Sequence, residues 1–150
     1  MGDTPQDEIA ALLDERVEAC RAKDVDRLMA LYSPDVVYFD VVPPLRFTGT
    51  DAVRRNFRRW FAEYEGPIGL TTVDQRVAVD GDVAFAHMIH HDSGSLDAAS
   101  DTHERAEERN LWLRSTVCLR RTEHGWRITH EHISLPVDPR TMRAVPDLAP

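Results

Sequence analysis

The chain has 150 residues, of which 42% are hydrophobic and 29% charged, the balance of one globular domain that can bury a core without metal or disulfide crosslinks. A formal net charge of −8 argues against a nucleic-acid-binding protein. No stretch approaches the ~20 apolar residues of a membrane helix, and the N-terminus lacks a signal-peptide pattern. The two cysteines lie far apart in no pairing motif, which favours a reducing compartment and a cytoplasmic location.

Three helices are expected in the first half of the chain. The first runs over 4–23, where Thr4 can cap the helix and Pro5 suits its first position. A second, short helix follows Asp24 and ends at Ser33-Pro34-Asp35. The third begins at Thr50 or Asp51, and its apolar residues recur at intervals of three and four. Its four arginines predict a solvated helix face.

The remaining segments predict strands. Residues 36–41 are rich in β-branched and aromatic side chains, and Pro43-Pro44 ends that strand. Four further strands are expected at 70–79, 83–91, 109–121 and 126–134. The polar segment 92–107 predicts a long loop. Residues 136–150 predict a tail that lies loosely on the surface of a single domain spanning 1–150. Because helices and strands are segregated, the fold class is α+β with a mostly antiparallel sheet.

Several segments carry a family resemblance. They are Leu31-Tyr32-Ser33-Pro34-Asp35, the glycine-marked entry to the third helix at 47–53, Arg114-Ser115-Thr116, and the strand from Gly125 to Pro136. Together they resemble the nuclear transport factor 2-like superfamily, and within it SnoaL-like and ketosteroid isomerase-like proteins. The resemblance implies a cone-shaped half barrel, a curved sheet with the three helices packed on its concave side. It also implies a pocket and a homodimer through the sheet, but no single chemistry.

Asp40 is the first candidate catalytic residue. It follows the first strand on the face of Tyr38, and the resemblance implies a general base at this place, which takes a proton from a carbon next to a carbonyl. The other interpretation is a turn residue that accepts hydrogen bonds from the segment after it. The first helix has no tyrosine for an oxyanion hole of the ketosteroid isomerase kind, and steroid isomerisation is therefore not predicted.

Strand alternation supplies the other candidates. In the last strand, Trp126, His130 and His132 share one predicted face, and in the strand before it Trp112, Arg114 and Thr116 share another. We expect both faces to form the pocket wall, with His130 and His132 as acid, base or hydrogen-bond donors and Arg114 opposite negative charge. Trp112, Thr116, Trp126, Tyr38 and Trp60 are expected to contact substrate. The residues on the other face of the strand at 109–121 are expected to point outward and to pack against a second copy in a dimer. They are Leu111, Leu113, Val117 and Leu119.

Three functions fit this pattern. The first is an enzyme without cofactor or metal that isomerises, cyclises or dehydrates a small apolar or carbonyl compound. The second is a binding module in which Arg114 and the histidines hold a carboxylate. The third is a dimerisation domain whose pocket is filled by Trp60, Trp112 and Trp126. Of the histidines, His90 and His91 point to opposite faces, and no spacing matches a known metal site.

Overall fold

The computed structural model describes residues 2–97 and 108–150. Its elements follow the order α1 (Pro5–Arg21), α2 (Val25–Met29), β1 (Tyr32–Phe39), β2 (Phe47–Thr48), α3 (Thr50–Ala62), β3 (Gly69–Asp80), β4 (Val83–Ser95), β5 (Glu108–Thr122), β6 (Gly125–Ser134), β7 (Val137–Asp138) and β8 (Arg143–Ala144).

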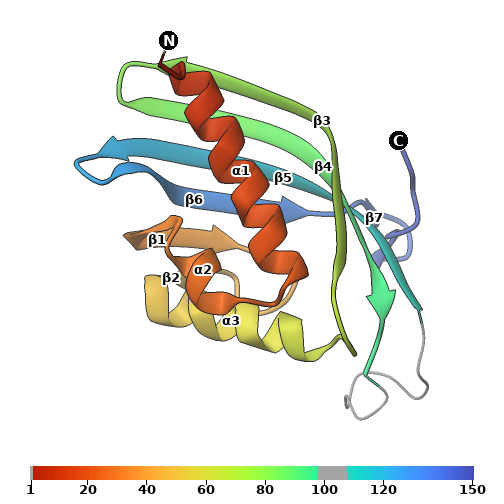
Figure 1. The fold of residues 1–150 in the computed structure, drawn as a ribbon. Coiled ribbons are helices and arrows are strands. Elements are labelled where there is room, and N and C mark those ends of the chain that lie inside the picture. The colour runs from red at the N-terminus through yellow and green to blue at the C-terminus, as the bar shows by residue number, and fades with distance from the viewer. Residues whose placement is uncertain (1, 98–107) are drawn as a thin grey trace.

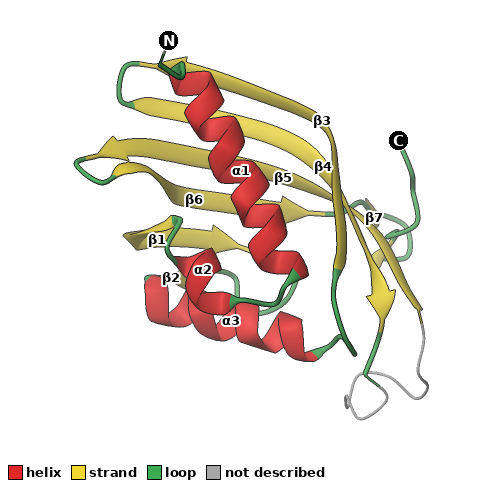
Figure 2. Cartoon of the chain, in the orientation of Figure 1, coloured by secondary structure: helices red, strands yellow, loops and turns green. Residues whose placement is uncertain are grey.

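The main sheet has six strands in the order β2-β1-β6-β5-β4-β3. All neighbouring pairs are antiparallel except β1 and β6, which run parallel. Figure 1 shows α1 lying across the concave face of this curved sheet, with α2 and α3 at its β1 end. Figure 2 shows the same segregation of helices and strands. The predicted α+β fold with a curved, mostly antiparallel sheet is therefore confirmed.

Helix α1 begins where the sequence predicts. The Thr4 side chain accepts a hydrogen bond from the backbone N–H of Asp7, whose carboxylate accepts one from the Thr4 N–H in return. This capping box satisfies two backbone donors that the first helical turn leaves free. Ile9, Leu13 and Cys20 are then buried against the sheet, because they recur on one face of the helix.

Two irregularities bend the sheet around α1. The pairing of β3 with β4 shifts register between Val73 and Arg76, where Asp74 adopts a φ of 56°. The pairing of β5 with β6 shifts between Cys118 and Leu119, which leaves Thr129 as an extra residue in β6. Such bulges increase the local twist and bend of a strand. The second one also exchanges the faces of all later residues in β6.

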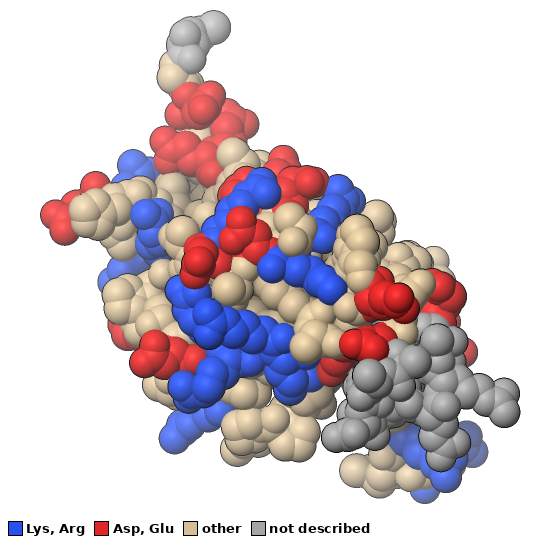
Figure 3. Space-filling view, turned by 60° about the horizontal axis from the view of Figure 1, so that its bottom comes forward, with Lys and Arg blue, Asp and Glu red and all other residues tan. Residues whose placement is uncertain are grey.

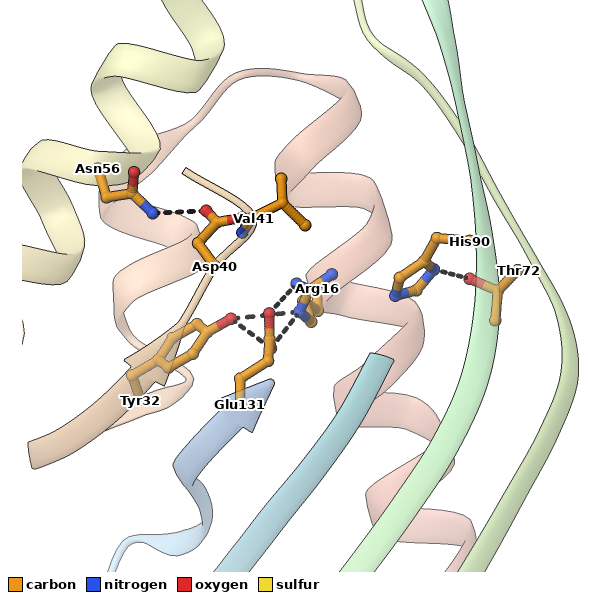
Figure 4. Close-up of polar contacts among 8 residues, drawn as sticks. All are labelled: Arg16, Tyr32, Asp40, Val41, Asn56, Thr72, His90 and Glu131. Carbon is orange, nitrogen blue, oxygen red and sulfur yellow. Dashed lines mark hydrogen bonds and ion pairs between the residues drawn. The ribbon is translucent and has the colours of Figure 1, made fainter. Parts of the chain in front are cut away.

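A buried ion pair joins α1 to the sheet. Arg16 donates two hydrogen bonds to the carboxylate of Glu131 in β6, one of 2.9 Å from Nε to Oε1 and one from its terminal nitrogen to Oε2. The hydroxyl of Tyr32 in β1 donates to the same Oε1 at 2.9 Å. Glu131 is fully buried, and its charge is therefore balanced by groups from two other elements (Figure 4).

The end of the sheet near the C-terminus differs from expectation. Strand β4 continues to Ser95, so Asp92 lies in a strand and not in the predicted loop. Most of that predicted loop, 98–107, lies outside the described residues.

The tail forms the small hairpin of β7 and β8, and the backbone N–H of Trp112 donates to the carbonyl of Pro146. That residues 1–150 form a single domain stays a prediction.

The arginines of α3 lie on the side of the molecule that Figure 3 brings forward, where Lys and Arg form a band flanked by Asp and Glu. Arg55, Arg58 and Arg59 are exposed, and Arg54 pairs with Asp26. In the part of the chain that the structure describes, no helix is long and apolar enough to cross a membrane.

We predict that Glu131→Ala lowers the free energy of unfolding by about 3–5 kcal/mol, because it leaves the buried Arg16 guanidinium without its counter-charge. Urea unfolding followed by circular dichroism measures this loss. Glu15→Ala is the matched control, since the Glu15–Arg27 pair has side chains 39% and 41% exposed and such pairs contribute roughly 0.2–1 kcal/mol. Equal losses in the two variants would contradict the assignment of the Arg16–Glu131 pair as the charge-dependent link between α1 and the sheet.

Candidate functional site

A cavity of about 170 Å³ opens between α1, α3 and the concave face of the sheet. Its walls are mainly apolar and aromatic, with ionisable side chains at several points. The lining residues are Arg16, Tyr38, Asp40, Val41, Val42, Phe57, Arg59, Trp60, Glu63, Leu70, His90, Asp92, Arg109, Leu111, Leu113 and Ile133. An apolar cavity with a few converging polar groups is the usual form of a small-molecule site.

Asp40 lies on the cavity wall directly after β1. Its Oδ1 accepts a hydrogen bond of 2.7 Å from the backbone N–H of Val41, and its Oδ2 accepts one of 2.8 Å from the side-chain amide of Asn56 in α3 (Figure 4). Both contacts come from N–H donors, and together they fix the orientation of the carboxyl group on the cavity wall. The sequence-predicted turn contact and the predicted pocket position are therefore both present.

A chain of polar contacts leads from Asp40 along the rim. The buried Asn56 accepts two hydrogen bonds from Arg59 through its Oδ1, of 3.2 and 3.0 Å, and these orient its amide nitrogen toward Asp40. Arg59 also pairs with Glu63, and Glu63 pairs with Arg109 of β5. The guanidinium of Arg109 lies over the ring of Tyr64, 5.3 Å from its centroid. Asp40 is thus held in place by residues that span α3 and β5.

Asp92 and His90 form a second polar pair on the cavity wall. They are two residues apart in β4, on one face, and are 4% and 3% exposed. Burial raises the pKa of the Asp92 carboxyl to about 7; Arg16 and Arg109 oppose this rise, and the charge of Asp40 adds to it. Burial, together with the charge of Arg16, lowers the pKa of His90 to about 3. Near neutral pH the imidazole is therefore neutral, and the carboxyl is protonated in a large part of the molecules.

The predicted face of β6 is wrong beyond Thr129. Ile128 faces the core as expected, but the bulge at Thr129 places Glu131 and Ile133 on the concave side instead of His130 and His132. His130 donates from Nδ1 to the carbonyl of Val37 at 2.7 Å, and both histidine rings contact Phe39 on the outer face. Asp40 and the two histidines are therefore not brought together.

The predicted face of β5 is also wrong. Leu111 and Leu113 line the cavity and Val117 and Leu119 are buried, because this more apolar set faces the concave side of the sheet. The set expected in the pocket lies on the outer face: Arg114 donates to Ser134, Thr116 is exposed, and Trp112 stacks on His91. A homodimer through the sheet stays a prediction, and the four apolar residues do not form its surface.

The three tryptophans divide between these places. Trp60 of α3 lines the cavity, as expected. Trp126 is buried on the concave side but at the other end of α1, where its indole N–H donates to Glu8 at 3.0 Å and Arg121 lies over its ring. Of the residues predicted to contact substrate or act in catalysis, the cavity brings together Asp40, Tyr38 and Trp60.

Sequence reasoning missed Arg16, His90 and Asp92. Arg16 sits on the apolar face of α1, where a charged residue requires a buried partner, and that was the signal available. His90 and Asp92 continue the alternating buried positions Ala84, Ala86 and Met88 of β4. This alternation marks Asp92 as an inward strand residue, although the polar composition after it resembles a loop.

We predict that Asp92→Asn stabilises the protein more as pH rises. The pKa of Asp92 in the folded chain, about 7, exceeds its ordinary 3.8, so between these values the folded state retains a proton that the unfolded state has released. The free energy of unfolding of the native chain therefore falls across this range, by an amount on the order of 2–4 kcal/mol, and an amide does not titrate. Urea unfolding of both chains at about pH 4, 6 and 8 measures the difference.

The control for this prediction is the exposed Asp35→Asn, which is expected to change stability little and equally at each pH. A gain from Asp92→Asn that is the same below pH 4 and above pH 7 would contradict the raised pKa. The lowered pKa of His90 acts in the opposite sense, since its contribution is lost as pH falls from 6.5 toward 3. The difference between native chain and variant removes this second titration from the measurement.

Comparison with known proteins agrees with the architecture. A solved NTF2-like protein of unknown function from Pseudomonas putida KT2440 is 29% identical, with a TM-score of 0.82 over 95% of this chain and 94% of its own. A proposed dehydratase of the NTF2-like family from Streptomyces avermitilis is 22% identical, with a TM-score of 0.75 over 89% and 97%. A proposed aromatic ring hydroxylase from Novosphingobium aromaticivorans DSM is 19% identical, with a TM-score of 0.73 over 89% and 91%.

The two last structures show the shared fold alone. No curated protein matches this sequence. The model of the SnoaL-like domain matches residues 9–138, which include most of α1, every strand of the main sheet and all the described residues that line the cavity. The chain therefore belongs to the SnoaL-like domain family of the NTF2-like superfamily.

Proposed function

We propose that the chain is an enzyme that moves a proton within a small carbonyl compound, without a cofactor. The observation that carries this proposal is a pair of carboxyl groups in unlike environments on one cavity. Asp40 accepts two N–H hydrogen bonds, whereas Asp92 is buried with its pKa raised to about 7. Two carboxyl groups in such different surroundings on one cavity form an acid–base pair suited to proton transfer.

In this proposal Asp40 is the base. Its carboxylate removes a proton from the carbon next to the carbonyl and returns it to the same or a neighbouring carbon, so that the net reaction is an isomerisation. With a hydroxyl on the next carbon, the C–O bond of the same enolate breaks, and the leaving oxygen takes the proton from Asp40 and departs as water. With an electrophilic carbon within reach, the enolate carbon bonds to it and closes a ring, and the proton on Asp40 passes to the oxygen of that electrophile. Asn56 positions the carboxylate and does not itself exchange a proton with substrate.

Asp92 is the partner for the developing negative charge. A protonated carboxyl donates a hydrogen bond to the enolate oxygen, and in an apolar cavity such a bond is stronger than it is in water. Asp92 thereby supplies the acid that sequence reasoning did not find. The first helix, which has no tyrosine, contributes Arg16 to the cavity wall, and the charge of Arg16 is matched by Glu131. The carboxylic acid of Asp92 is therefore the proposed oxyanion donor.

Two further features belong to this proposal. Both cysteines are free thiols, which fits a cytoplasmic location. On the outer face of the sheet Val83 and Phe85 are about half exposed, at 48% and 51%, which fits a homodimer through that face. The neighbouring structures named above as a dehydratase and a hydroxylase agree with a small-molecule role, although at their identities they support the fold and not a reaction.

Deuterium exchange of a cyclic ketone tests the proposal. We expect the protein to accelerate exchange of the α-hydrogens of cyclohexanone in D2O, followed by NMR, because each reaction above begins with their removal. Asp40→Asn is expected to reduce the acceleration by roughly 10²–10⁴-fold, the usual contribution of a positioned base. Asp35→Asn, at an exposed position of β1, is the control and should leave the rate unchanged.

Exchange no faster than in buffer, or equally fast in Asp40→Asn, would overturn the enzyme proposal. The second function expected from the sequence, a binding module without turnover, then remains, since the same cavity can bind a ligand without a working base. Unfolding curves of both variants show whether a lost rate reflects lost structure.

A further inference from the structure

One buried polar atom on the cavity wall lacks a hydrogen-bond partner. The Nδ1 of His90 contacts the hydroxyl of Thr72 in β3 at 2.9 Å, but within the described part of the chain its Nε2 has none. The ring extends from β4 toward the side where Arg16 lies (Figure 4). An unpaired buried nitrogen destabilises a protein, because it has given up its hydrogen bonds to water without replacing them. A ligand oxygen at this point removes that penalty.

The neighbouring Asp92 offers a second contact to the same oxygen. Its carboxyl lies on the same face of β4 as the imidazole and lines the same cavity. Side chains two apart on one strand face lie roughly 7 Å apart at their Cβ atoms, so one small group can contact both. A neutral carboxyl donates one hydrogen bond, and a neutral imidazole donates or accepts one according to its tautomer. A carbonyl or hydroxyl oxygen satisfies this pair.

The size and walls of the cavity limit the rest of the ligand. A volume of about 170 Å³ is close to that of an engineered apolar cavity of ~150 Å³ that holds one benzene ring. Drug-sized ligands occupy sites of roughly 300–1,000 Å³. Phe57, Trp60 and Leu113 supply flat and apolar walls. The cavity therefore fits one six-membered ring, and a four-ring steroid exceeds it.

The charges around the cavity are already matched. Its guanidinium groups belong to Arg16, Arg59 and Arg109. The first pairs with Glu131, and the other two share Glu63. Asn56 connects Arg59 to the carboxylate of Asp40. Among the described residues, three positive and three negative groups thus surround the cavity while Asp92 holds its proton. A charged ligand would disturb that balance in surroundings of low polarity.

We propose that the cavity takes an uncharged single-ring compound whose carbonyl or hydroxyl oxygen is held between Asp92 and His90. This inference rests on the proposed function and names the substrate class of the same site. It assigns to His90 the role of a substrate-binding residue, and it places the oxygen at the β4 wall while the carbon that loses its proton faces Asp40. The carboxylate that Arg114 was expected to hold in a binding module is not part of this site, since Arg114 lies on the outer face.

Binding should also depend on pH, since an ionised Asp92 cannot donate. The ionisable groups that act on Asp92 come from each wall around it. They are Arg16 of α1, Arg109 of β5, Asp40 after β1 and His91 of its own strand, while Cys20 of α1 and Tyr64 after α3 have their own pKa values affected by it. The thiol and the phenol titrate only near pH 12. Asp92 is therefore the group expected to govern binding between mildly acidic and mildly alkaline pH.

The test uses the intact chain and four probe compounds that each contain a cyclohexane ring. Cyclohexanone and cyclohexanol are the uncharged single rings, cyclohexanecarboxylate carries a charge, and 1-decalone has two rings. We expect both uncharged single rings to bind at about pH 5.5, measured by NMR titration, and the other two to bind at least about tenfold more weakly. At about pH 8.5 the dissociation constant for cyclohexanone should rise by roughly tenfold or more, because few molecules then hold the proton on Asp92.

Two variants distinguish the contribution of Asp92 to binding from that of His90. Asp92→Asn keeps a neutral donor, so it should bind cyclohexanone with equal affinity at both pH values. His90→Leu should weaken binding at both pH values and keep the pH dependence. Equal binding of the carboxylate or of decalone would overturn the proposal, as would a pH dependence that persists in Asp92→Asn or an unchanged affinity in His90→Leu. A different result would contradict the proposed function: cyclohexanone that binds to the protein but whose α-hydrogens do not exchange.

Discussion

The ion pair between Arg16 and Glu131 is the contact on which the arrangement of the cavity depends. It places two opposite charges in the interior, where each alone would be strongly unfavourable, and it therefore ties α1 to β6 at one position. Tyr32 adds β1 to the same cluster. Helix, central strand and parallel strand thus meet at a fixed point, and the walls that carry Asp40, His90 and Asp92 are held around it. Burial lowers the pKa of His90 and keeps its imidazole neutral near neutral pH, and the charge of Arg16 adds to this effect.

Much of the fold was predictable from local pattern, whereas the faces of two strands were not. The hairpin at Asp80-Gly81-Asp82 and the capped start of α1 follow from residue types that favour those structures. The side chains of a strand alternate only while its register is unbroken. One extra residue at Thr129 therefore moved His130 and His132 to the outer face and Glu131 inside. Nothing in the residues from Trp126 to Ser134 marks that insertion, because it depends on pairing with β5.

The candidate site was predictable to a smaller degree. Asp40 was recognised because the resemblance assigns an acid to that place, and its hydrogen bonds to Val41 and Asn56 agree with a positioned carboxylate. Asp92 was assigned to a loop because the segment that follows it is polar, although its burial is set by α1 and β5, far away in the sequence. The composition of a segment predicts the average character of its residues. A functional acid is a single residue whose environment differs from the one that its neighbours in the sequence suggest.

The identity of residue 92 bears on the choice between catalysis and binding. An asparagine there would donate a hydrogen bond at every pH and would avoid the loss of stability that a buried carboxyl brings as pH rises. A binding module therefore gains nothing from the carboxyl that the amide does not also supply. A carboxyl differs in that it can give a proton to an oxygen and take it back, and that ability matters only if a reaction moves charge onto the ligand. Destabilising polar groups concentrate at active sites for this reason. The choice of aspartate over asparagine is thus itself an argument that the cavity performs proton transfer.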